Sequence, residues 1–173
     1  MKRVSPLSPL MIEPPVRLAL AEDLGRGGDI TSCSVILPET RAHVVIAARR
    51  EGVIAGLDVA ETVFRLVDPS LELKRLRSDG DEVRAGDVLM EIEGSARSIL
   101  TAERVALNFI GRMSGIATLT RKMVRAVGNH KARICSTRKT TPGLRALEVY
   151  AVEAGGGARH RMGLDDAVLI KDN

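Results

Sequence analysis

The sequence predicts an α/β protein in which a compact α/β unit precedes the opening of a parallel sheet. The first 95 residues alternate short β-branched runs with segments of helical periodicity. Toward the end of the chain, two short runs rich in apolar residues flank one helical segment. Short apolar strands joined by a helix are typical of parallel strands that are covered on both faces. This last region therefore opens either a βα-barrel or a doubly wound sheet.

Helices are predicted where apolar residues recur with helical spacing between a start and a stop signal. The first covers 14–24 and is followed by the glycine-rich connector 25–32. Asp58 is expected to cap the second helix, which has an apolar face. Ser98 is expected to cap the third, which two glycines weaken near its middle and which resumes through Val127.

Strands are predicted where β-branched residues cluster or where apolar and polar residues alternate. In the first part of the chain these runs are 42–48, 53–55, 71–76 and 88–92. Residues 78–81 have the composition of a turn. The two apolar strands of the last part are 132–135 and 167–170. Thr141-Pro142 should open the helix between them, and a run of three glycines should end it.

Composition excludes several classes of protein. Apolar residues make up 45% and charged residues 28%, which is a globular balance. The net charge of +4 suits nucleic acid, an anionic membrane or small anions, but 2% aromatic residues offer almost no platform for stacked bases. No stretch suits a signal peptide or a membrane span. The two cysteines lack metal-ligand spacing, so we expect reduced thiols and a cytoplasmic location.

Cationic residues gather near the two apolar strands of the last part, and ligands of parallel α/β folds bind at the carboxyl ends of strands. Thr137-Arg138-Lys139 follows the first strand and Lys171 follows the second, while His160-Arg161 lies in the segment before the second. Taken singly, each would more often be a solvated surface charge. Several cations gathered at the same end of a sheet repel one another unless a ligand of opposite sign is bound. The pattern therefore predicts a site for a small, multiply anionic substrate.

Other polar or special residues are expected to be structural. Asp29 and Asp81 should be cap or turn residues, and Cys135 should pack in the core. The glycines 155–157 lack the spacing of a nucleotide-binding fingerprint and should form a helix end and loop.

A series of motifs, in order, resembles the quinolinate phosphoribosyltransferase family. They are EDLG at 22–25, GDITS at 28–32, ERVALN at 103–108, SGIAT at 114–118, TRKTTPGLR at 137–145, GGG at 155–157, HRMGL at 160–164 and VLIKDN at 168–173. Together they cover nearly the whole chain and are highly specific. The resemblance implies an N-terminal α+β sandwich-like domain over 1–110. Residues 111–173 would then be the first part of a parallel α/β barrel, incomplete in this chain.

The resemblance also implies a reaction. The family transfers the phosphoribosyl group of phosphoribosyl pyrophosphate to quinolinate with decarboxylation, giving nicotinate mononucleotide, CO₂ and pyrophosphate on the de novo route to NAD. Mg²⁺ accompanies the donor, and the enzymes are homodimers with shared active sites. Quinolinate carries two carboxylates and the donor two phosphate-bearing arms, which agrees with a strongly cationic pocket.

Site residues follow from the resemblance by position. The substrate-binding residues are Arg104, Thr137, Arg138, Lys139, His160, Arg161 and Lys171. Arg138 and the pair His160-Arg161 would hold the quinolinate carboxylates. Lys139 and Lys171 would be the catalytic residues, which neutralise charge on substrate and donor. Arg104 would reach into the site of the partner subunit, and no metal ligand is expected within this chain.

Three alternatives stay open at this point. A molybdenum-transport-associated relative of the same superfamily and a nicotinate phosphoribosyltransferase are less well supported by TRKTTPGLR and HRMGL than the quinolinate enzyme is. A non-enzymatic carrier-like domain is suggested by residues 79–89, which resemble half of a biotinyl or lipoyl domain but contain no lysine to modify.

With two barrel strands the chain cannot close a barrel, so it is expected to be an amino-terminal portion that is inactive alone.

Overall fold

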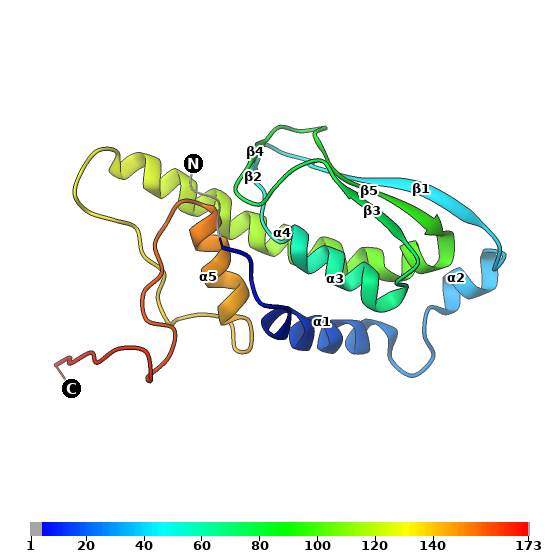
Figure 1. Cartoon of the computed structure of the whole chain (residues 1–173), viewed down its shortest axis with the longest axis horizontal. Helices are drawn as coiled ribbons and strands as arrows, with labels where there is room; N and C mark the ends of the chain where they lie inside the picture. The colour runs from blue at the N-terminus through cyan, green and yellow to red at the C-terminus, as the bar shows by residue number, and fades with distance from the viewer. Residues whose placement is uncertain (1–4, 173) are drawn as a thin grey trace.

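The computed structural model describes residues 5–172, in which a three-stranded sheet covers a layer of helices (Figure 1). The helices are α1 (Pro9–Leu24), α2 (Ile30–Val35), α3 (Leu57–Val67), α4 (Ala96–Val127) and α5 (Arg145–Ala154). The strands are β1 (Arg41–Ala47), β2 (Gly52–Val53), β3 (Glu72–Arg75), β4 (Glu82–Val83) and β5 (Val88–Ser95). The predicted mixed α/β class is confirmed.

The sheet is antiparallel, with β5 in the centre and β1 and β3 at its sides. Alternate residues of β5 enter the core: Met90 is 0% exposed and Ile92 is 1% exposed, whereas Glu93 is exposed. β2 and β4 form a separate two-stranded pair. All four strands predicted before residue 95 are present, although β2 is shorter than the run 53–55 and β5 extends beyond 92.

Two helices begin earlier than predicted because serines further upstream cap them. The Ser8 hydroxyl accepts a hydrogen bond from the Leu10 backbone N–H at 3.4 Å, and α1 therefore starts at Pro9. α4 starts at Ala96 because Ser95, and not Ser98, is its cap. The Ser98 backbone N–H is instead the donor to that cap, at 3.3 Å.

The predicted connector 25–32 contains the start of a helix. Asp29 caps α2 by accepting a hydrogen bond from the Ser32 backbone N–H at 2.9 Å, which confirms its assignment as a cap residue. Side-chain and backbone hydrogen bonds from Ser32 lower the pKa of Asp29, as expected for a carboxylate that serves as a cap.

α4 is one continuous helix of 32 residues. Gly111 and Gly115 do not interrupt it, and a Cβ at either position would meet nothing within 4 Å. The predicted domain boundary between 110 and 111 falls inside this helix and stays a prediction. α4 therefore connects the sheet-bearing part of the chain to everything after residue 127. No helix among residues 5–172 is both long and apolar enough to cross a membrane.

The N-terminus of α3 is capped by a residue distant in sequence. The predicted cap, Asp58, lies inside the first turn of the helix, and the N-cap is Gly56, at φ 101°. The carboxylate of Asp79 accepts hydrogen bonds from the backbone N–H groups of Gly56 at 2.9 Å and Leu57 at 3.1 Å. A carboxylate suits this position because the first N–H groups of a helix have no partner within the helix.

Asp79 also binds α5, because it accepts a hydrogen bond from the Tyr150 hydroxyl at 2.9 Å. Burial raises the pKa of Asp79 although its three hydrogen bonds oppose the shift, and burial together with Asp79 raises the pKa of Tyr150. The predicted turn at 78–81 is present, and it joins the first part of the chain to α5.

All three elements predicted after residue 127 differ from expectation. The run 132–135 forms only a single bridge, at Cys135, and no strand. The run 167–170 is not a strand: Val168 is 91% exposed and Ile170 is 89% exposed. An apolar strand needs hydrogen-bonding neighbours and cover on both faces, and the described residues provide neither there. Thr141-Pro142 forms a turn, and α5 starts later, at Arg145. The end of α5 at Gly155 agrees with the prediction.

Asp79→Ala should lower the free energy of unfolding by about 2 kcal/mol, because three donors lose a shared acceptor. Urea denaturation measures it. Asp81→Ala is the matched control in the same turn, where the Asp81 carboxylate accepts from the exposed Ser78 backbone N–H at 2.8 Å. We expect that control to lose less than about 1 kcal/mol, and equal losses for the two variants would contradict the role of Asp79.

Candidate functional site

Two segments of the last part of the chain lie side by side and parallel. Cys135 and Ala158 form a parallel bridge, in which the Ala158 N–H donates to the Ile134 carbonyl at 2.8 Å and the Ser136 N–H donates to the Ala158 carbonyl at 2.9 Å. The His160 N–H then donates to the Ser136 hydroxyl at 3.2 Å. The partner of the first predicted strand is therefore the segment around Ala158, and not 167–170.

This pairing changes the predicted place of His160-Arg161. These residues were expected in a segment that leads into a strand, but they come just after the bridged residue Ala158, with only Arg159 between. Thr137-Arg138-Lys139 follows the other side of the same bridge. Because the two segments are parallel, both sets of side chains leave from the same end of the pair. The structure thus brings together the two segments that carry five of the predicted site residues.

Cys135 at the bridge is exposed, so its predicted place in the core is wrong. The bridge is a single residue pair, and no helix of the described chain covers Cys135.

Arg145 links the two cationic segments through its side chain. Its Nε donates to the Thr140 hydroxyl at 3.2 Å, and its guanidinium donates to the Met162 carbonyl at 2.9 Å. Thr140 belongs to the first segment and Met162 to the second. In the sequence, Arg145 was noted only as the last residue of the motif TRKTTPGLR. Its linking role could not be predicted, because no local pattern shows that its side chain binds a loop 17 positions later.

Arg138 differs from the other arginines near α5. Its side chain is half-buried, and its Nε is a buried donor with no hydrogen-bond partner in the described part of the chain. A buried donor without a partner costs free energy, and an anionic ligand can supply the missing acceptor. Among the predicted site residues, Arg138 has the clearest structural signal of a binding role.

The remaining predicted residues are placed as follows. Thr137 and Lys139 are exposed, and the Thr137 hydroxyl accepts from the Lys139 N–H at 3.1 Å, which shapes the turn. The Arg161 guanidinium donates to the Ala167 carbonyl at 2.8 Å. Lys171 is exposed, and no hydrogen bond or ion pair between described residues joins it to the other cations. Figure 1 shows the segment after α5 running outward to the C-terminus.

Arg104 lies apart from these residues. It is exposed on α4, about two turns before Arg112, the first α4 residue bonded to α5. Within the described chain the structure does not bring Arg104 to the cationic segments. The predicted role of Arg104 in the partner subunit's site stays a prediction.

α5 is held at its first turn by an ion pair. Arg112 of α4 binds Glu148 through Nε at 3.1 Å and also through its terminal nitrogen. The other Glu148 oxygen accepts from the Thr141 N–H at 3.2 Å. Burial raises the pKa of Glu148, but the hydrogen bonds from Arg112 and Thr141 outweigh it and hold that pKa below its ordinary value. Glu148 thus fixes the motif loop at Thr141 onto the body of the protein.

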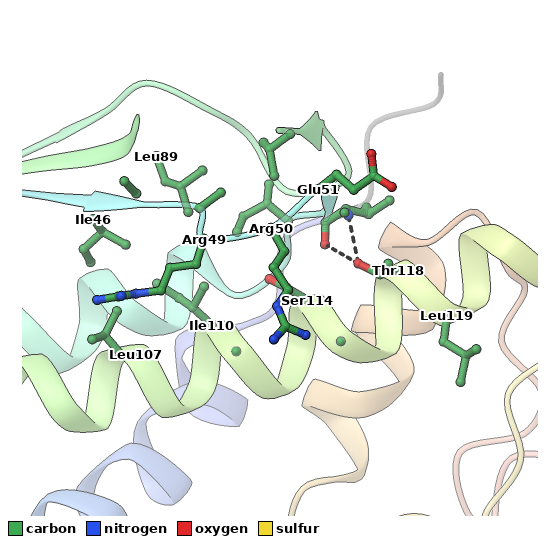
Figure 2. Close-up of a pocket in the computed structure, with 18 of the residues that line it drawn as sticks. Ile46, Arg49, Arg50, Glu51, Leu89, Leu107, Ile110, Ser114, Thr118 and Leu119 are labelled. Carbon is green, nitrogen blue, oxygen red and sulfur yellow. Dashed lines mark hydrogen bonds between the residues drawn. The ribbon is translucent and has the colours of Figure 1, made fainter. Parts of the chain in front are cut away.

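A large hollow lies away from these cationic residues. A cavity of about 680 Å³ opens between the β1–β2 connection and α4 (Figure 2). Leu107 and Ile110 provide apolar walls, and Arg49 and Arg50 stand at its rim. The Thr118 hydroxyl binds the backbone of β2 there, accepting an N–H at 2.9 Å. None of the predicted site residues lines this cavity.

No group of three or more His, Cys, Asp or Glu side chains among residues 5–172 is arranged to hold a metal ion. The cationic segments themselves are unsuitable for one, because Mg²⁺ prefers oxygen ligands and anionic neighbours. Any Mg²⁺ that takes part would have to be held by other groups.

The combination of an α+β unit, a parallel bridge and cations that follow both bridged residues is that of an α/β protein with a candidate anion-binding site. The family model of the quinolinate phosphoribosyl transferase N-terminal domain matches residues 29–114. The model of the C-terminal domain of the same family matches residues 116–173. The chain belongs to the quinolinate phosphoribosyltransferase family, and this excludes the carrier-like alternative.

Curated relatives support the same assignment. The chain is 50% identical to quinolinate phosphoribosyltransferase (decarboxylating) 1 of Nicotiana glauca, over 91% of this chain and 45% of that protein. It is 47% identical to a probable nicotinate-nucleotide pyrophosphorylase (carboxylating) of Synechocystis, over 95% of this chain and 55% of that protein. The chain therefore spans about half the length of the curated relatives it matches.

Solved structures are similar over nearly the whole chain. NadC from Streptococcus pyogenes has a TM-score of 0.93 at 42% identity, covering 97% of this chain and 59% of that one. The nicotinate-nucleotide pyrophosphorylase from Francisella tularensis has a TM-score of 0.91 at 38% identity, covering 99% of this chain and 61% of that one. The predicted fold class, an N-terminal α+β unit followed by the start of a barrel, is confirmed by these matches.

Glu148→Gln should weaken the pH dependence of stability on the acid side. Because the folded-state pKa of Glu148 is lowered, its contribution is complete above the unfolded value of 4.5 and is lost as pH falls through the folded value. Thermal unfolding of wild type and variant at a series of pH values from neutrality to below 4.5 measures this. The variant should be less stable at neutral pH by about 1 kcal/mol, and the difference should shrink on acidification.

Glu153→Gln is the control for this experiment. Glu153 lies on the same helix and makes no side-chain hydrogen bond to any other described residue. A Glu148→Gln variant whose pH profile matched that of wild type would show that the ion pair with Arg112 does not hold α5.

Proposed function

We propose that this chain supplies the quinolinate-binding part of a decarboxylating quinolinate phosphoribosyltransferase. The enzyme would transfer the phosphoribosyl group of phosphoribosyl pyrophosphate to quinolinate, releasing CO₂ and pyrophosphate and forming nicotinate mononucleotide for NAD synthesis. The observation that carries the proposal is the buried, unpartnered Nε of Arg138 beside a parallel pair whose two ends both bear cations. A dicarboxylate provides the acceptors and the negative charge that this arrangement lacks.

The two ends of the pair suit a ligand with two carboxylates. Arg138 extends from one segment and His160-Arg161 from the other, so each carboxylate can be held from a different side. Lys139 and Lys171 would act as point charges that neutralise substrate and donor. Departure of pyrophosphate leaves positive charge on the ribose ring, so the protein contributes mainly by positioning and electrostatics rather than by a covalent intermediate.

Mg²⁺ is proposed to enter with the donor. Mg²⁺ usually keeps several waters and binds through substrate phosphates with one or two carboxylates. When bound, it would neutralise charge on the leaving pyrophosphate. No residue of this chain is assigned to it. The cytoplasmic location expected from the cysteines likewise stays a proposal.

Arg138→Ala should raise the quinolinate KM by at least about tenfold or abolish turnover, because it removes the donor whose acceptor is missing. The assay follows quinolinate consumption and CO₂ release with phosphoribosyl pyrophosphate and Mg²⁺, on the protein at the full length of its relatives.

Arg133→Ala is the matched control, since Arg133 is an exposed cation at the opposite end of the same segment. It should retain the wild-type KM. Turnover of nicotinate in place of quinolinate by the wild-type protein would overturn the substrate assignment. Loss of folding in Arg138→Ala would return Arg138 to a structural role.

The proposal includes a homodimer in which Arg104 serves the partner's site. Its exposed place on α4, away from its own subunit's cationic segments, supports this. Arg104→Ala and Arg138→Ala proteins should each be nearly inactive. Unfolding and refolding the two together should restore about a quarter of wild-type activity, because half of the dimers are mixed and each mixed dimer has one intact site. No recovery would place both residues in the same subunit's site.

A further inference from the structure

Arg121 is a buried charged residue that the proposed site does not use. It lies on α4 and is only 7% exposed. Its Nε donates to the Gly155 carbonyl at 2.9 Å, and its Nη2 donates to the Ala154 carbonyl at 3.3 Å. Its Nη1 binds the carboxylate of Glu82 in β4 at 2.5 Å. One guanidinium therefore joins the end of α5 to the first part of the chain.

The carbonyl groups that Arg121 binds belong to the last turn of α5. The last carbonyl groups of a helix receive no hydrogen bond from within the helix. The helix dipole also places partial negative charge on them, so a cation is favoured there. A buried arginine is costly unless each of its donors is occupied. Its planar fork can reach two carbonyls and a carboxylate at once, which a lysine cannot do.

The glycine turn after α5 lies directly on α4 next to Arg121. A Cβ at Gly155 would come within 2.5 Å of the Ala117 carbonyl and 2.6 Å of the Thr120 Cβ. Gly156 has a φ of 91°, which favours glycine, and a Cβ at Gly157 would lie 2.7 Å from Val152. The sequence predicted only a helix end here, and the structure adds a close contact with α4 that fixes where the chain emerges.

The chain passes from this turn straight into the candidate site. Ala158 follows Gly157 and is the residue that bridges to Cys135. His160 then binds the Ser136 hydroxyl through its backbone N–H. His160 comes five positions after Gly155, whose carbonyl Arg121 holds, so a shift of that carbonyl moves the second cationic segment relative to the first.

We propose that Arg121 is a positioning residue, which fixes the end of α5 and thereby the register of the segment bearing His160-Arg161 against the segment bearing Arg138. This proposal rests on the proposed function for its catalytic consequence. Its structural part is independent of that function. Arg121 contacts no substrate in this account and acts through the glycine turn.

Arg125 provides a matched control. It lies one turn further along α4 and also binds the Glu82 carboxylate, at 2.8 Å, but it is exposed and makes no hydrogen bond to α5 in the described structure. Arg125→Met therefore removes a cation and an ion pair to Glu82 without touching the glycine turn. Arg121→Met removes the ion pair to Glu82 and also the hydrogen bonds to the end of α5. Arg121→Lys keeps the positive charge but lacks the planar guanidinium that reaches several acceptors at once.

The first measurement is hydrogen–deuterium exchange of the backbone amides of Ser136 and Ala158, both of which donate across the parallel bridge. In Arg121→Met these amides should exchange about tenfold faster than in wild type, while amides of the β1–β5 ladder keep their protection. Arg125→Met should leave both sets unchanged. If Arg121→Met does not fold, Arg121→Lys should show the same change with a smaller amplitude. Unchanged exchange in a folded Arg121 variant would overturn the proposal.

The second measurement is steady-state kinetics on the protein at the full length of its relatives. Arg121→Met or Arg121→Lys should raise the quinolinate KM by about tenfold and leave the KM for phosphoribosyl pyrophosphate within about twofold. A purely structural role would lower the apparent kcat with both KM values unchanged, and that result would contradict positioning. A wild-type protein that does not consume quinolinate would refute the proposed function, while the exchange experiment would still decide whether Arg121 sets the register.

Discussion

The attachment of α5 to α4 is the interaction on which the candidate site depends, because α5 is the connection between the two segments that carry the cations. A helix of ten residues has little stability of its own, so its place is set by tertiary contacts. Polar groups hold it near its first turn through Arg112, at its middle through Asp79 and at its end through Arg121. Together with the packing of its buried apolar face, these three directional contacts fix the position of the helix along its axis.

The arginines of this region fall into two groups by the state of their donors. Arg112, Arg121 and Arg145 donate to acceptors within the chain, so they are fixed and largely satisfied. Arg138 keeps a buried Nε without a partner. The same residue type therefore fixes the scaffold at Arg112, Arg121 and Arg145 and presents an unused donor at Arg138.

Most strands could be predicted from the sequence because their signals are local, and β-branched runs marked them. Clustered cations after an apolar run marked the candidate site, and the structure brings two of the cationic segments together. Capping of α3 by Asp79 could not be predicted, since its donor and acceptor are 22 residues or more apart. The strand-like segment at Ala158 was also missed, because glycines needed for contact with α4 hide it. The run 167–170 has the stronger apolar signal but lacks neighbours to pair with among the described residues.

Equilibrium binding decides whether the two cationic segments bind a ligand with two carboxylates. Isothermal titration of the protein at the full length of its relatives would compare quinolinate with nicotinate, which lacks one carboxylate. We expect quinolinate to bind at least about tenfold more tightly, since each charge-assisted contact is worth about 1.5–3 kcal/mol. Equal affinity for the two ligands, or binding of quinolinate unaltered by Arg138→Ala, would contradict it.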